Sequence, residues 1–183
     1  MLSSQGYREL TTPGTLNDGT PLRYAKGLSV FEQGGRRVLA HGGGIPGFLS
    51  QVTYYPEEDL SVIVLVNTAG PPGPGAIAND IVQLLLVDRP TPPAKVYSGN
   101  MEHLKGTYRG PGRGGEFVVT IDTEAGNLTA AMGEAEPTAL SFVDGLTFRL
   151  GNTTFTFMME SEVVDRLQVD QISGLYVLRP DPL

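Results

Sequence analysis

The sequence contains no cysteine. This absence excludes disulfide bonds, a thiol nucleophile and any cysteine-based metal site. Its two histidines, His41 and His103, lie far apart and form no close ligand pair, so we expect no metal and no cofactor. No apolar run approaches the ~20 residues of a membrane-spanning helix. The first residues lack the basic and apolar stretches of a signal peptide, so we expect a soluble chain. The sequence does not determine its cellular compartment.

Basic residues are also few. Lysine and arginine number 13 against 20 acidic residues, which gives a formal net charge of -7. Nucleic acids and anionic membranes require clustered positive charge, so neither is an expected partner. The content of 40% hydrophobic and 18% charged residues is typical of a folded protein. With 183 residues, the chain is long enough for one full domain or two small ones.

Glycine, by contrast, is abundant, and four of the 24 glycines lie in one seven-residue stretch. Residues 41–47 read His-Gly-Gly-Gly-Ile-Pro-Gly, between the segments Arg36–Ala40 and Phe48–Tyr55. These flanking segments predict strands, with the glycines as the loop between them and His41 at a strand end. A histidine can donate, accept or carry charge near neutral pH, and glycine N–H groups can face a developing oxyanion. A simple turn with a structural histidine is the alternative interpretation.

The N-terminal half reads as a small sheet with little helix. The expected elements are a helix end at Ser3–Leu10, strands at Tyr24–Glu32, Arg36–His41, Phe48–Tyr55 and Leu60–Asn67, and an amphipathic helix at Ala76–Leu86. The run Leu60–Val66 is almost wholly apolar, as in strands that are covered on both faces. The second helix can cover one face only. The segment therefore looks like part of a larger α/β domain.

The C-terminal half changes character after a proline-rich stretch. Residues 88–95 predict a stiff linker, so we expect domains at 1–88 and 101–183 joined by residues 89–100. Short β-branched and aromatic segments recur beyond it, separated by turn residues. We expect strands at Gly106–Arg109, Phe117–Asp122, Leu128–Ala131, Ala139–Val143, Thr147–Leu150, Thr153–Met159, Arg166–Val169 and Leu175–Leu178. About eight such strands favour an antiparallel meander closed into a barrel.

Four segments together resemble the C-terminal part of the serine β-lactamase-related superfamily, which includes class C β-lactamases, penicillin-binding DD-peptidases, D-aminopeptidases and esterases. They are Tyr24–Leu28, His41–Phe48, Tyr55–Glu57 and Val62–Asn67. The resemblance implies that the glycine motif lies on an edge strand of the active-site sheet. It assigns His41 to the first motif position, Gly43 to the glycine that leaves room for substrate, and Gly44 to the second oxyanion-hole N–H.

The region from Leu104 onward is similar to the lipocalin-like β-barrel that several peptidase members carry. The implied fold class is α+β: a partial β-lactamase-like antiparallel sheet with a C-terminal helix, followed by a barrel of about eight strands. Catalytic roles fall on His41 and Gly44, and substrate-binding roles on Gly42 and Gly43.

The sequence departs from the family in its nucleophile. That superfamily attacks through a Ser-x-x-Lys motif and uses a Tyr-x-Asn motif for proton transfer. None of the lysines here follows a serine by three places, and no tyrosine is followed by asparagine two places on. Ser50 is the nearest hydroxyl to the glycines, but no nucleophile-elbow motif surrounds it. Residues 57–59 are expected to form a solvated acidic turn, and residues 110–115 a strand connection rather than a phosphate loop.

We therefore expect the C-terminal portion of a serine hydrolase that acts on a peptide, a β-lactam or an ester and is inactive alone. A start inside a helix end hints at a truncated reading frame. Two alternatives stay open. The chain is a ligand-binding or regulatory β-barrel module, or it is half of a two-chain enzyme whose partner, or a second copy, covers the bare sheet.

Overall fold

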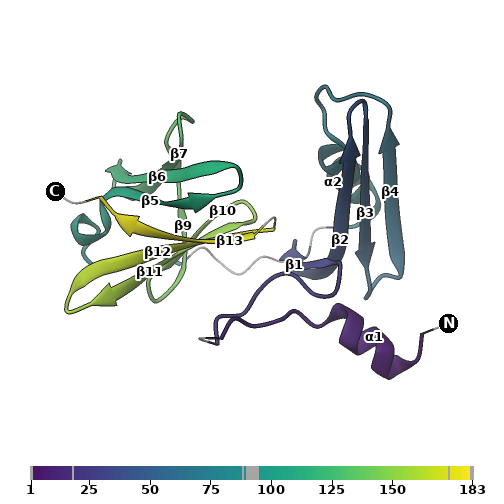
Figure 1. Ribbon diagram of the computed structural model, residues 1–183, viewed down its shortest axis with the longest axis horizontal. Helices are drawn as coiled ribbons and strands as arrows, with labels where there is room; N and C mark the ends of the chain where they lie inside the picture. The colour runs from purple at the N-terminus through teal and green to yellow at the C-terminus, as the bar shows by residue number, and fades with distance from the viewer. Residues whose placement is uncertain (1, 18, 88, 90–94, 173, 182–183) are drawn as a thin grey trace. The chain divides into compact units, whose positions relative to one another are not determined.

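The computed structural model describes residues 2–17, 19–87, 89, 95–172 and 174–181. The chain divides into two compact units, Met1–Pro92 and Pro93–Leu183 (Figure 1). Each unit has its own antiparallel sheet and its own hydrophobic core. Of the predicted linker 89–100, residues 90–94 lie outside the described residues.

The first unit is a four-stranded sheet with two helices. Its elements are α1 (Ser4–Thr11), β1 (Ser29–Gln33), β2 (Arg36–Ile45), β3 (Phe48–Tyr55), β4 (Leu60–Val66) and α2 (Pro74–Leu85). The strands lie in the order β1-β2-β3-β4, so each pairs with its neighbour in sequence. Gly34 and Gly35 take positive φ in the β1–β2 turn, as the tight turn of a hairpin requires.

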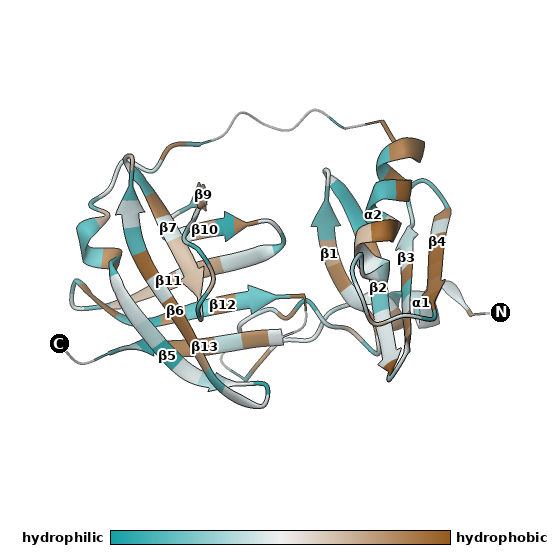
Figure 2. Cartoon of the chain, turned by 90° about the horizontal axis from the view of Figure 1, so that it is seen from above, coloured by the Kyte–Doolittle hydropathy of each residue, from teal (hydrophilic) through white to brown (hydrophobic). Residues whose placement is uncertain are grey.

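The two faces of this sheet differ sharply. Val62 and Val64 point to the face that α2 covers, where Ala78 and Val82 pack with them in one core. Ile63 and Leu65 alternate with them on β4 and leave 66% and 77% of their surface exposed. Figure 2 shows the hydrophobic colouring of both β4 and α2. The expectation that α2 covers only one face of the sheet is confirmed.

The second unit is a nine-stranded antiparallel sheet. Its elements are the 3₁₀ turn η1 (Glu102–Leu104), β5 (Gly106–Gly112), β6 (Gly115–Glu124), β7 (Asn127–Met132), β8 (Thr138–Ala139), β9 (Ser141–Asp144), β10 (Thr147–Leu150), β11 (Thr153–Glu160), β12 (Val163–Gln171) and β13 (Gly174–Pro180). The spatial order is β8-β7-β6-β5-β13-β12-β11-β10-β9. The first and last strands of the unit therefore pair, through Arg109 with Arg179 and Tyr108 with Pro180.

Leu140 joins the two ends of this sheet. The predicted strand 139–143 is in fact two strands, β8 and β9, which are the sheet's edges and are separated only by this residue. Leu140 is 7% exposed, and its N–H donates to the Leu128 carbonyl oxygen at 2.8 Å. The chain turns a corner here because a buried leucine anchors it. The sheet thus curls until its edges are neighbours, which is how a meander disposes of open edges.

Side chains fill the interior of the second unit. Tyr108, Phe148, Phe155 and Phe157 are each at most 2% exposed, and Phe148 meets Phe157 edge to face at 5.9 Å between ring centroids. Tyr108 also donates its hydroxyl to the Leu104 carbonyl oxygen at 2.8 Å. A small apolar ligand would therefore have to displace packed aromatic rings from this interior. Across both units, none of the helices in the described part of the chain has the length and apolarity to cross a membrane.

Candidate functional site

The three glycines lie in a strand. The expectation of a glycine loop after a strand Arg36–His41 is wrong, because β2 runs on to Ile45 and pairs with β3 as far as the Ile45–Phe48 pair. The chain reverses at residues 46–47, where Gly47 takes the positive φ of +83° that the third position of a Pro-Gly turn needs. Glycine is a poor strand former by itself, so pairing with an apolar neighbour, β3, overrides local propensity.

The far half of β2 is open on one side. Its pairing with β1 begins at Gln33–Arg36 and ends at Ser29–Ala40. Within the described residues, β2 therefore has strand neighbours on both sides only over Arg36–Ala40, and His41–Ile45 has β3 alone. His41 and the three glycines after it are exposed. Backbone N–H and C=O groups along such an edge are available to an extended ligand.

His41 has a specific partner at this edge. Its Nε2 lies 2.9 Å from the Tyr24 hydroxyl oxygen in a hydrogen bond, and the two rings meet edge to face with centroids 6.0 Å apart. Tyr24 belongs to the segment before β1, 17 residues upstream. No spacing rule links the two positions, so sequence reasoning assigned no site role to this tyrosine. Only the pairing of β1 with β2 brings them together.

Gly43 faces Ser50 across the strand pair. The Ser50 hydroxyl lies 3.5 Å from the Gly43 carbonyl oxygen. A Cβ on Gly43 would come within 2.7 Å of that hydroxyl oxygen, and a Cβ on Gly44 within 2.9 Å of the Leu49 Cδ2. Both contacts are closer than real Cβ atoms tolerate, so a side chain at either position requires Ser50 or Leu49 to change its rotamer.

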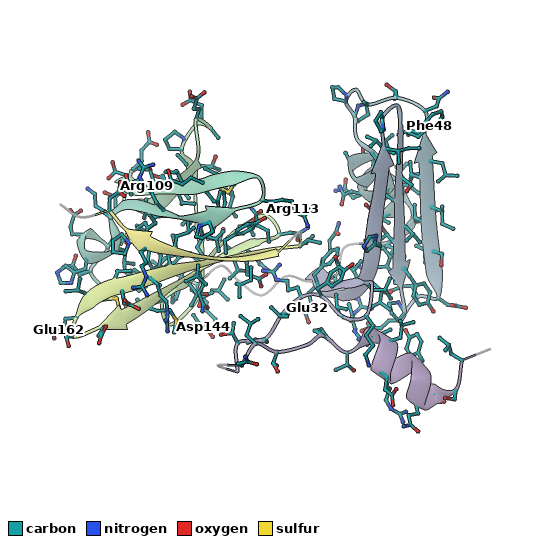
Figure 3. All side chains as sticks on the ribbon, viewed as in Figure 1. Glu32, Phe48, Arg109, Arg113, Asp144 and Glu162 are labelled. Carbon is teal, nitrogen blue, oxygen red and sulfur yellow. The ribbon has the colours of Figure 1, made fainter. Side chains whose placement is uncertain are left out.

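A hollow of about 510 Å³ opens at this end of the sheet. It is lined by Gly43, Gly44, Ile45, Phe48, Leu49, Ser50, Leu65, Val66 and Asn67. Figure 3 shows Phe48 at the end of the sheet where β3 begins. The lining is mainly apolar, with the Ser50 hydroxyl, the Asn67 amide and the glycine backbone as its polar groups. This composition resembles that of small-molecule sites.

Within the described residues, Ser50 contacts no base that could take its proton. Its recorded hydrogen bond is to the Gly43 carbonyl oxygen, which can only accept. The ring of His41 is instead engaged by Tyr24. A serine nucleophile needs a base that takes its proton, and the described contacts give Ser50 none.

The acidic turn between β3 and β4 is structural. Glu58 is not the solvated residue that the sequence predicted, because its Oε1 accepts from Arg36 Nε at 2.6 Å and from Arg89 Nη2 at 2.7 Å. Arg89 also pairs with Glu57 at 2.7 Å, and this bond, the largest cause, raises the pKa of Arg89. Arg89, near the end of the first unit, is thus bound to the turn between β3 and β4. Arg36 of β2 binds the same turn. Within the described residues, no group of three acidic or histidine side chains is placed to hold a metal ion.

The family match covers the first unit only. The β-lactamase family model matches residues 1–87. A D-aminopeptidase of Brucella ovis is 41% identical over 64 residues, which are 35% of this chain and 12% of that protein. A D-aminopeptidase of Brucella anthropi is 35% identical over 80 residues, 44% of this chain and 15% of the relative. The chain thus spans less than a sixth of these relatives' length.

A crystal structure of SurE with D-Leu resembles the whole chain in fold. It covers 98% of this chain and 44% of its own, with a TM-score of 0.50 and 17% sequence identity. At that identity the likeness concerns the fold alone. It extends over both units, whereas the family match ends near the last residue of the first.

Proposed function

We propose, from the match of the β-lactamase family model to residues 1–87, that β2 carries the substrate-binding edge of a serine acyl-transfer site. His41 and Gly44 are its catalytic residues, and Gly42 and Gly43 lie against the substrate. The reaction is acyl transfer on a peptide, a β-lactam or an ester. The D-aminopeptidase relatives favour a peptide that carries a D-residue as the first substrate to test.

One observation carries this proposal: β2 continues beyond β1 as an exposed edge of histidine and glycines beside an apolar hollow. An extended substrate can lie along such an edge and bond to its backbone. The missing side chains at Gly43 and Gly44 let the substrate approach the main chain closely. Ser50 and Asn67 then supply polar contacts in the lining of the hollow.

In this proposal the chain stabilises the charge that develops in the transition state. Attack by a serine on the acyl carbon produces a tetrahedral oxyanion, and the Gly44 N–H donates a hydrogen bond to it. His41 assists proton movement or binds a substrate carboxylate. The attacking serine and its lysine come from a Ser-x-x-Lys segment outside these 183 residues, since the sequence contains no such motif.

The first test is chemical labelling of the purified chain. With a fluorophosphonate or a fluorescent penicillin, we expect no mass increase, because the described residues place no base against Ser50. An adduct on any serine would contradict the proposal that the nucleophile lies elsewhere. Ser50→Ala would then show whether that residue had reacted.

The oxyanion role is tested in a chimera. The matching segment of the Brucella ovis D-aminopeptidase is replaced by that of this chain, and peptide hydrolysis is measured. Gly44→Pro removes the N–H and should lower kcat by about 10²–10³-fold, the usual cost of one oxyanion donor. Gly44→Ala keeps the N–H but adds a Cβ against Leu49, so it controls for bulk. Equal losses in both variants would refute the N–H role.

The bare face of the sheet supports a second candidate, half of a two-chain enzyme. Ile45, Phe48, Val52, Ile63 and Leu65 are all exposed on β2, β3 and β4. A cluster of this kind is typical of a surface that another polypeptide covers. Sedimentation of the pure chain tests whether a second copy is the polypeptide that covers this face. A monomer at high concentration argues against self-association through it.

A further inference from the structure

We propose that Tyr24 is a positioning residue for His41: its phenol orients the imidazole and selects which ring nitrogen carries the proton. The inference rests on the proposed function, because it matters only if His41 faces a substrate. Its evidence, however, is the geometry of the two residues. The hydrogen bond of 2.9 Å and the edge-to-face ring contact fix the imidazole from one side.

His41 lies just beyond the part of β2 that β1 covers, so its ring needs another contact to hold it. Ser29 pairs with Ala40, and β1 offers no residue opposite His41. The backbone of His41 is held from the other side only, by its pairing with Val52 of β3. Without a further contact, an exposed histidine ring would be free to rotate about its χ angles. The Tyr24 phenol lies against this ring, just before the first residue of β1.

The backbone around Tyr24 is itself well anchored. Tyr24 forms an isolated antiparallel bridge with Ser29, the same residue that pairs with Ala40. Its carbonyl oxygen accepts from the Gly14 N–H at 3.2 Å. On either side, Val30 N–H donates to the Arg23 carbonyl oxygen at 2.7 Å, and Ala25 N–H to the Leu28 carbonyl oxygen at 2.8 Å. The phenol therefore extends from a backbone that main-chain bonds hold in place.

The chemistry of the pair determines the proton positions. A neutral imidazole has one N–H donor and one bare nitrogen acceptor, and the bond at one nitrogen sets the role of the other. A phenol O–H is a good donor, and a bare imidazole nitrogen accepts more strongly than a phenol oxygen. Tyr24 therefore donates to Nε2, and the proton of neutral His41 resides on Nδ1. In this tautomer, His41 offers its Nδ1–H as a donor to a substrate oxygen.

The experiment is nitrogen NMR of the two histidine rings in the ¹⁵N-labelled full chain at pH 8. His103 lies in η1 of the other unit and serves as the internal reference. His41→Gln assigns the His41 resonances by their loss. In the wild-type chain, His41 should show a protonated Nδ1 and a bare Nε2 as the major species.

Tyr24→Phe removes only the hydroxyl and keeps the ring contact. We expect the Nδ1–H form of His41 to fall from the major to the minor species, because an exposed imidazole in water favours the Nε2–H form. Tyr54→Phe is the matched control. It deletes another phenol hydroxyl of the same sheet, which donates to Asp59 at 3.0 Å, and should leave His41 unchanged.

Two outcomes overturn the proposal: a wild-type His41 protonated on Nε2, or ring nitrogens unmoved by Tyr24→Phe while the amide spectrum shows an intact fold. Neither depends on acyl transfer. Failure of the chimera with an intact tautomer change would instead count against the proposed function and leave the positioning role standing.

Discussion

Ser50 occupies the space that a side chain on Gly43 would need. The hydroxyl oxygen lies 2.7 Å from the ideal Cβ position, on the strand directly opposite. The two residues are therefore coupled, because the Ser50 hydroxyl lies where a side chain on Gly43 would be. Both residues line the hollow at this end of the sheet.

Gly43→Ala should destabilise the first unit by roughly 1 kcal/mol, because the methyl group forces the Ser50 hydroxyl into another rotamer. The double variant Gly43→Ala with Ser50→Ala should recover most of that loss, since the clashing oxygen is gone. Urea unfolding of wild type, both single variants and the double variant measures the coupling. Strictly additive changes would show that the two residues do not compete for space.

Arg36→Ala should destabilise the first unit more than Arg89→Ala. The Arg36 side chain is 11% exposed and that of Arg89 38%, although both bind the same Glu58 oxygen. Loss of Arg36 removes the more buried partner of Glu58 and leaves Arg89 alone on its Oε1, which should cost roughly 1–3 kcal/mol, the usual range for a hydrogen bond to a charged group. Denaturant midpoints of the two variants provide the comparison. Glu58→Gln removes the charge and should make the two arginine substitutions more nearly equal.

Tyr108 should be among the last tyrosines to ionise. Burial raises its pKa to about 12. Since the unfolded phenol ionises near pH 10, the folded state binds one more proton between these values. The stabilisation is complete below about pH 10 and is lost as the pH rises toward 12. Unfolding midpoints across this range should fall less steeply in Tyr108→Phe than in the wild-type chain.

Leu65→Lys should weaken any self-association without a large change in the unfolding midpoint. Leu65 is 77% exposed, so a charge there loses little packing but opposes burial against another chain. Val163→Lys is the control, because Val163 is 67% exposed on the other unit. Sedimentation equilibrium of both variants checks the prediction. Equal effects would locate the contact away from the bare sheet face.

Much of the fold could be predicted because it depends on local patterns. Strands β3 and β4, helix α2 and most of the second unit's strands follow from alternating or continuous apolar runs bounded by turn residues. Element ends were less predictable. The glycines of β2 have no strand preference of their own, and only pairing with Phe48–Val52 makes them a strand. The break at Leu140 likewise depends on its burial and its bond to Leu128.

The sequence by itself determined the chemistry available to this protein: no thiol, two histidines, no Ser-x-x-Lys motif, and one glycine-rich stretch that resembles a substrate-binding strand. Tertiary structure alone decided how these parts meet. It placed Tyr24 on His41, Ser50 against Gly43, and both arginines on Glu58. The physical reason is that a sequence pattern reports which face of its own element a residue occupies, whereas contacts across strands depend on register and on where each strand ends.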